Sequence, residues 1–201
     1  MKTIVMDTSN KYLVIALYDQ GQCLDVIQEE GNRRQSEYAI VYLEKLLNHH
    51  HLKVKDFGEM IITIGPGSYT GVRVALTIAK TLATTTSIKI KTISSLKAYA
   101  GYDEAISVLD ARSHKVFVGV YQNGHDLIKE KMIDINEFDQ IMKKYPKFKV
   151  VGDCDLVGQA QNEADLAQNM YQLAKNEFYV VDIDNLVPVY LKSVEAKKIC
   201  K

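Results

Sequence analysis

A glycine-rich turn at residues 65–71 is the stretch of this sequence best suited to bind an anion. It reads Gly-Pro-Gly-Ser-Tyr-Thr-Gly and follows the short apolar run 61–64. Glycine tolerates positive φ and proline fixes φ, so this composition predicts a tight turn between a buried strand and a helix. Backbone N–H groups at the start of a helix favour phosphate. Gly65, Gly67 and Ser68 are therefore candidate nucleotide-binding residues.

The spacing of this turn differs from the standard phosphate-binding motifs. A Walker A motif needs Gly-Lys five and six residues after its first glycine, where this chain has Thr70 and Gly71. The Rossmann fingerprint also fails, because the third glycine comes one residue late. A close-packed turn without a ligand is the alternative interpretation, with Ser68 or Thr70 as the helix cap.

Two aspartates that follow apolar strands, Asp7 and Asp110, form a second set of candidate site residues. They coincide when residues 4–21 are set above residues 107–124, at an offset of 110 − 7 = 103. We interpret this match as an internal duplication, in which each half begins with a strand, an Asp-led turn, a strand and a glycine turn; two hairpins that match by chance are the alternative. The aspartates could form an acid pair between the halves, or could each shape a turn through Asx geometry. The other matched pairs are Tyr18 with Tyr121 and Gly21 with Gly124.

A run of three histidines, His49, His50 and His51, could suggest a metal site. Consecutive side chains point in different directions on a helix or a strand, so they seldom converge on one ion. A polar helix end, where histidine favours the helix dipole, is the preferred interpretation. We expect no metal site in this chain.

The elements that must position these residues alternate between strands and helices. Three strands joined by tight polar turns predict an antiparallel meander, and the rest of the chain predicts a mixed α/β protein. We expect two lobes, an N-terminal one at 1–100 and a C-terminal one at 101–201. The expected strands are 3–6, 12–18, 23–28, 61–64, 88–93, 127–133 and 149–151, the expected helices are 36–47 (capped by Ser36), 72–83, 94–100, 136–144 and 163–175, and the apolar tail 186–191 should dock on the protein.

Small residues form a stripe on the helix predicted at 72–83. Ala75, Ala79 and Ala83 are four residues apart, so they lie on one side of the helix. Such a stripe allows another helix to approach closely. Packing of the stripe onto the chain's own sheet is the alternative.

Composition excludes several classes of protein. The 201 residues carry no net charge, so no overall field attracts nucleic acid. No apolar run approaches the roughly 20 residues of a membrane span, and Asp7 interrupts the N-terminal apolar stretch too early for a signal peptide. Cys23, Cys154 and Cys200 are scattered, as is typical of a reduced protein. We expect a cytoplasmic location.

Four segments together resemble the bacterial TsaB (YeaZ) family. They are Val-Met-Asp-Thr-Ser at 5–9, the glycine turn extended to Arg73, Val-Leu-Asp-Ala-Arg at 108–112 and Leu-Val-Pro-Val-Tyr-Leu at 186–191. The resemblance implies an actin-like (ASKHA, ribonuclease H-like) ATPase fold of two duplicated lobes, the second degenerate. In that fold Asp7 and Asp110 would lie near the phosphates of a nucleotide held between the lobes, which makes both candidate nucleotide-binding residues. It also implies a role in the N6-threonylcarbamoyl modification of adenosine 37 in tRNA, as a non-catalytic partner.

The resemblance implies partners as well. They are a TsaD-type ATPase paralogue, a TsaE-type small ATPase and a second copy of the chain, with tRNA reached only through the complex. The chain itself would hold no cofactor, and ATP or ADP and Mg²⁺ would be bound by the partner complex. The shared contact would be a bundle of two helices, with these interface residues: Tyr38, Val41, Tyr42, Lys45, Val72, Ala75, Leu76, Ala79 and Ala83.

A metal-binding histidine pair of the catalytic paralogue aligns with Ser95 and Tyr99 of this chain. Serine and tyrosine are poor replacements for two imidazoles, so we expect no catalytic residue here. An active nucleotide-dependent transferase or kinase on the same fold is the rival hypothesis. A homodimeric interaction module unrelated to tRNA is the third.

Overall fold

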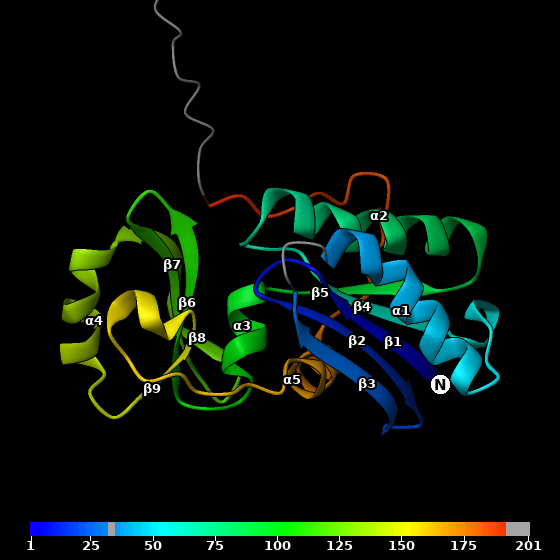
Figure 1. Cartoon of the computed structure of the whole chain (residues 1–201), viewed down its shortest axis with the longest axis horizontal. Helices are drawn as coiled ribbons and strands as arrows, with labels where there is room; N and C mark the ends of the chain where they lie inside the picture. Colours follow the sequence, from blue (N-terminus) through cyan, green and yellow to red (C-terminus); the bar gives the residue numbers. More distant parts are fainter. Residues whose placement is uncertain (32–34, 192–201) are drawn as a thin grey trace, which may run out of the picture.

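The chain folds around two β-sheets that lie side by side in a computed structural model (Figure 1). The structure describes residues 1–31 and 35–191, without the side chains of residues 35 and 36. The side chain of the predicted cap Ser36 and the whole of Cys200 therefore lie outside the described part. In that part, no helix is long and apolar enough to cross a membrane.

The first sheet has the strand order β3-β2-β1-β4-β5. The first three strands form the predicted antiparallel meander, and β1, β4 and β5 run parallel to one another. Strands β1 and β4 are apolar because both faces of the sheet are covered. The bounds are β1 Lys2–Asp7, β2 Tyr12–Asp19, β3 Gln22–Glu30, β4 Glu59–Thr63 and β5 Lys89–Ile93.

The second sheet repeats this topology with the order β8-β7-β6-β9. Again a meander of three strands is extended by a strand parallel to the first, here β9 beside β6. Adding 103 to the bounds of β2, 12 and 19, gives 115 and 122, which are the bounds of β7. The predicted duplication is thus confirmed. The bounds are β6 Ala105–Arg112, β7 Lys115–Gln122, β8 His125–Asp134 and β9 Lys149–Gly152.

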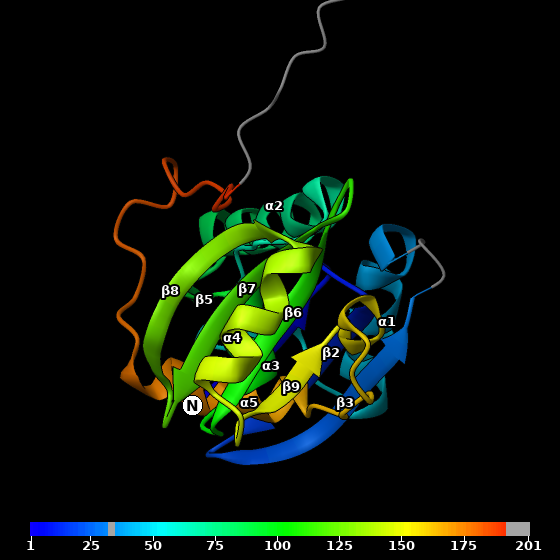
Figure 2. The ribbon, with the colours of Figure 1, turned by 90° about the vertical axis from the view of Figure 1, so that its left-hand side faces the viewer.

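Helices cover the outer faces of the sheets and fill the space between them. Helices α1 and α2 pack on the outer face of the first sheet, and α4 packs on the outer face of the second (Figure 2). Helices α3 and α5 lie between the sheets, in an apolar core that both lobes share. The bounds are α1 Gln35–His49, α2 Tyr69–Thr85, α3 Ser95–Ala100, α4 Phe138–Lys144 and α5 Leu166–Leu173, with short 3₁₀ turns η1 Val54–Asp56, η2 Ile135–Glu137, η3 Cys154–Val157 and η4 Ala174–Asn176.

The chain after β9 returns to the first lobe. Helix α5 contacts β1, β2, β3 and β4, and the tail follows α2 and β5 (Figure 1). The Val180 N–H donates to Ile90 O (2.9 Å) and the Val189 N–H to Ile64 O (2.8 Å), so the predicted docking of 186–191 is confirmed. Residues 166–191 therefore pack largely on the first sheet, although the predicted boundary at residue 101 assigns them to the C-terminal lobe.

Candidate functional site

The glycine turn is fastened to the turn between β1 and β2. Ser68 caps α2, since its Oγ accepts a hydrogen bond from the Gly71 N–H (3.2 Å). The Ser68 N–H donates to Ser9 O (2.7 Å), and Thr8 Oγ1 donates to Gly71 O (2.6 Å). The backbone groups that could hold a phosphate at Ser68 and Gly71 thus already have partners within the chain.

Close backbone approach explains the glycines of this turn. A Cβ at Gly67 would lie 2.5 Å from Ser9 O, and one at Gly71 would lie 2.0 Å from Thr8 O. Gly65 has φ +100°, and a Cβ there would lie 2.9 Å from Val189 O. These contacts support the close-packed turn. Nucleotide binding by Gly65, Gly67 and Ser68 stays a prediction.

Asp7 lies buried at the carboxyl end of β1. Its Oδ1 accepts hydrogen bonds from the Ser9 N–H (2.7 Å) and from Thr63 Oγ1 (2.5 Å) at the end of β4. Its Oδ2 is buried without a hydrogen-bond partner in the described part of the chain. Burial raises the pKa of the Asp7 carboxyl, although the bonds from Ser9 and Thr63 act to lower it.

Helix α3 brings two further hydroxyl groups to this place. Ser95 Oγ lies 2.9 Å from Ser9 Oγ, so it connects α3 to the turn after β1. Tyr99, one turn later, is buried, and its hydroxyl has no hydrogen-bond partner among the residues described. Burial raises the pKa of Tyr99 first, and the nearby charge of Asp7 adds to this effect. Asp7, Thr63, Ser9, Ser95 and Tyr99 thus form one buried polar cluster between the first sheet and α3, which we call the Asp7 cluster.

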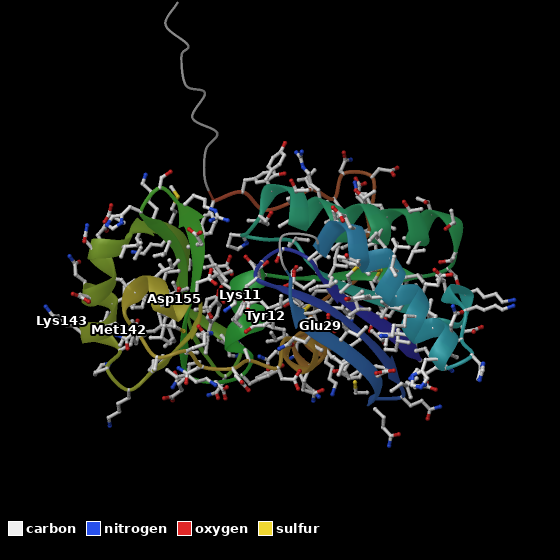
Figure 3. The ribbon with its side chains drawn as sticks, in the orientation of Figure 1. Lys11, Tyr12, Glu29, Met142, Lys143 and Asp155 are labelled. Atoms are coloured by element: carbon white, nitrogen blue, oxygen red, sulfur yellow. The ribbon has the colours of Figure 1, made fainter. Side chains whose placement is uncertain are left out.

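The sequence did not point to Thr63 or to Asp153. Thr63 ends the apolar parallel strand β4, and Asp153 directly follows the parallel strand β9. Asp7 ends β1 in the same way, so this position at the end of a strand is the signal that could have identified them. Asp153 Oδ2 accepts a hydrogen bond from the Asp110 N–H (2.8 Å), and burial raises the pKa of Asp153. Lys11 and Tyr12 lie at the junction of the lobes, with Asp155 on the other side (Figure 3).

Asp110 shapes the corresponding turn of the second lobe. Its Oδ1 accepts a hydrogen bond from the Arg112 N–H (2.7 Å), and its Oδ2 lies 2.8 Å from the Arg112 guanidinium. Asx geometry is confirmed for both Asp7 and Asp110. The side-chain hydrogen bonds of each aspartate stay within its own lobe, and a joint role at a nucleotide stays a prediction.

Comparison with known proteins identifies the family. Residues 26–151 match the family described as "TsaD: tRNA N6-adenosine threonylcarbamoyltransferase". The tRNA threonylcarbamoyladenosine biosynthesis protein TsaB of Bacillus subtilis is 30% identical, over 98% of this chain and 96% of that protein. The chain belongs to the TsaB (YeaZ) family. TsaB of Escherichia coli is 25% identical, over 61% of this chain and 55% of that protein.

Solved TsaB-family structures share the fold. YeaZ from Pseudomonas aeruginosa superimposes with a TM-score of 0.75 at 20% identity, over 94% of this chain and 99% of that chain. A second P. aeruginosa structure, described as similar to peptidase YeaZ, gives 0.76 over 95% and 99%. The predicted α/β fold of two similar lobes is confirmed and is the fold of these structures, whereas the degeneracy of the second lobe stays a prediction.

The Asp7 cluster differs chemically from a two-histidine metal site. At Ser95 and Tyr99, where the family resemblance predicts that the catalytic paralogue has two histidines, this chain has one hydroxyl engaged with Ser9 and one phenol beside Asp7. Neutral hydroxyl groups are weak ligands for Zn²⁺ or Fe²⁺ compared with imidazole. The hydroxyl groups of Ser95 and Tyr99 therefore do not fit a metal ion that is bound by two imidazoles.

The helices predicted as an interface present two different surfaces. On α1, Tyr38 is 40% exposed and Val41 53% exposed, Lys45 is exposed, and Tyr42 is half-buried with its hydroxyl bonded to Glu29 (3.1 Å). On α2 the prediction requires correction, because the chain's own core covers most of the proposed contact residues. Ala83 is half-buried, whereas the covered residues are Val72, Ala75, Leu76 and Ala79.

Two of the three consecutive histidines converge, contrary to expectation. His49 Nδ1 and His50 Nε2 each lie 3.0 Å from Asp25 Oδ2 on β3. His51 has φ +53° and lies outside this group. The expectation of divergent side chains holds only while the helix continues, and α1 ends at His49.

Proposed function

We propose that this chain is a non-catalytic partner subunit in N6-threonylcarbamoyladenosine modification of tRNA, which binds and supports a TsaD-type ATPase. TsaB relatives are named for this biosynthesis, and the family matched by residues 26–151 is the transferase itself. The observation that carries the non-catalytic role is the pair Ser95 and Tyr99. Their hydroxyl groups belong to a packed cluster, where a metal-dependent paralogue would need two imidazoles.

An exposed apolar stripe on α1 is the surface proposed for binding. Tyr38, Val41 and Lys45 are three and four residues apart, so they share one side of the helix. The opposite side is formed by Ala39, Leu43 and Leu46, which are buried against the first sheet. A helix surface with exposed tyrosine and valine suits a second apolar helix, from the ATPase paralogue or from a second copy of the chain. Ala75 and Ala79 of α2 are buried in the same core as Leu43 and Leu46, so they help to hold α1 in place.

The remaining components belong to the same proposal. ATP or ADP and Mg²⁺ are held by the partner complex, a TsaE-type ATPase joins it, and tRNA is reached through it. The chain acts in the cytoplasm. An active transferase or kinase on this fold is less well supported, because the glycine turn is packed against Thr8 and Ser9. ATP turnover by the purified chain would favour that rival.

The binding surface is tested by one charge substitution. Val41→Asp places a carboxylate in the centre of the stripe, whereas Leu127→Asp makes the same change at an exposed position (43%) of the second lobe. Sedimentation of each variant, alone and mixed with the TsaD-type paralogue of the same organism, measures association. We expect wild type and Leu127→Asp to form a heterodimer and Val41→Asp to remain unbound. Equal binding by all three would exclude α1 as the contact.

The pathway is tested separately in cells. Mass spectrometry of digested tRNA measures threonylcarbamoyladenosine after depletion of the chain, with rescue by each variant. We expect depletion to remove the modification, Leu127→Asp to restore it and Val41→Asp to restore little. An unchanged modification after depletion would overturn the function and leave the fold intact.

A further inference from the structure

The end of α1 and the neighbouring strand β3 bring together three groups that can bind a metal. Asp25 Oδ2 lies 3.0 Å from His49 Nδ1 and 3.0 Å from His50 Nε2. All three candidate ligand atoms lie within 4.8 Å of one another. Two ligands bound at about 2.0–2.2 Å to one tetrahedral Zn²⁺ ion are themselves roughly 3.3–3.6 Å apart, so small side-chain rotations suffice to enclose an ion.

The local backbone explains why two consecutive histidines reach the same oxygen. His49 is the last residue of α1 and His50 begins the turn that follows. Beyond the helix, consecutive side chains are no longer held about 100° apart. The rings also use different nitrogens, Nδ1 near the backbone of His49 and Nε2 at the far end of His50. The ring centroids lie 4.7 Å apart in an edge-to-face arrangement.

The carboxylate is held ready for this role. The Val26 N–H donates to Asp25 Oδ1 (2.9 Å), which fixes the carboxylate plane and leaves Oδ2 for the histidines. An ionised, oriented carboxylate is a ready ligand, and a hydrogen bond to its second oxygen is the kind of outer support that metal sites use.

We propose that Asp25, His49 and His50 form a binding site for a divalent transition metal ion of the zinc class. Two imidazoles and one carboxylate match Zn²⁺, Ni²⁺ or Cu²⁺, whereas Mg²⁺ and Ca²⁺ prefer all-oxygen ligands. His49 is 71% exposed, so water completes the coordination. The ion takes the place of the hydrogen bonds between the two rings and Asp25, and it connects the end of α1 to the edge strand β3.

A bound ion stabilises the docking of α1, the helix that carries the exposed stripe. Binding to the folded chain alone raises its stability in proportion to the logarithm of the free ion concentration. The site does not depend on the proposed function, because its ligands are distinct from the Asp7 cluster and from Tyr38, Val41 and Lys45.

Calorimetric titration of the full-length, tag-free and EDTA-treated chain with ZnCl₂ tests the proposal. We expect one ion per chain and a thermal midpoint that rises with Zn²⁺ and not with MgCl₂. Asp25→Asn, His49→Gln and His50→Gln should each weaken binding at least tenfold, because each removes one of three ligands. His51→Gln is the matched control and should change affinity less than twofold, since His51 lies outside the group.

Ring nitrogen chemical shifts supply a second readout that does not depend on stability. Zinc should shift His49 Nδ1 and His50 Nε2 and leave His51 unchanged. Absence of saturable binding would overturn the proposal. So would an affinity that Asp25→Asn leaves unchanged, or that His51→Gln lowers as much as His50→Gln, because either result describes a surface run of histidines without a built site.

Discussion

The carboxylates of Asp7 and Asp110, 103 residues apart, accept the same hydrogen bond. In each, Oδ1 takes the backbone N–H two residues ahead at 2.7 Å, from Ser9 in one lobe and from Arg112 in the other. Their surroundings differ, since Asp7 is buried and the Asp110 side chain is 30% exposed. The duplication has kept the turn geometry, while the packing around α3 has given the two acids different environments.

Asp7→Asn should change how stability depends on pH. Burial raises the pKa of Asp7 in the folded state above its unfolded value of about 4, so the folded chain holds the proton more tightly. This contribution is fully present below about pH 4 and is lost as the pH rises through the folded-state pKa. Each unit of raised pKa corresponds to about 1.4 kcal/mol.

Urea unfolding of wild type and Asp7→Asn from pH 4 to pH 8 measures this effect. The free energy of unfolding of wild type should fall relative to the variant as the pH rises. Parallel curves over the whole range would show that Asp7 does not titrate abnormally in the folded chain.

Gly71→Ala should destabilise the chain strongly. The added Cβ would lie 2.0 Å from Thr8 O, a backbone atom that cannot move without disturbing the turn after β1. Overpacking of this kind costs about 1–3 kcal/mol of unfolding free energy. Gly58→Ala is the matched control, because its Cβ would meet only the flexible Met1 side chain, at 3.0 Å from Sδ. Denaturant midpoints compare the two, and similar midpoints would contradict the close-packed turn.

Ala79→Arg should unfold the chain rather than dissociate a complex. Ala79 is completely buried among residues of the first sheet and α1. A larger side chain costs about 1–3 kcal/mol, and an unpaired buried charge adds roughly 3–5 kcal/mol. Thr77→Arg on the exposed side of α2 is the control and should unfold like wild type. If the Ala79→Arg chain folds normally and loses only its binding to a partner, the alanine stripe of α2 is an interface after all.

Arg73→Ala should loosen the docked tail. The Arg73 guanidinium lies 6.0 Å from the ring centroid of Tyr190 in the tail, and its Nε donates to the Tyr190 hydroxyl (3.1 Å). An exposed cation–π contact contributes about 0.5–1 kcal/mol, so hydrogen-exchange protection of the Val189 amide should fall about two- to fivefold. Lys175→Ala removes a similar contact with Tyr171, away from the tail, and should leave Val189 protected. Unchanged protection in Arg73→Ala would show that the hydrogen bond to Ile64 O holds the tail alone.

Local sequence patterns determined the strands, the turns and the duplication. The apolar runs that end at Asp7 and at residue 64, and the matched hairpins, could be predicted because strand alternation, turn residues and helix caps depend on neighbours in the chain. Ser68, one of the two candidate caps, caps α2 for the same reason.

Tertiary structure alone decided which side of each helix is covered and which distant groups meet. The alanine stripe of α2 suits either a partner helix or the chain's own core, and only the packing of α1 and the first sheet resolved it. The contact of Ser9 with Ser95 and the convergence of His49 and His50 on Asp25 join segments far apart in sequence. Such contacts depend on how whole elements pack, because spacing along the chain fixes the direction of a side chain only within its own helix or strand.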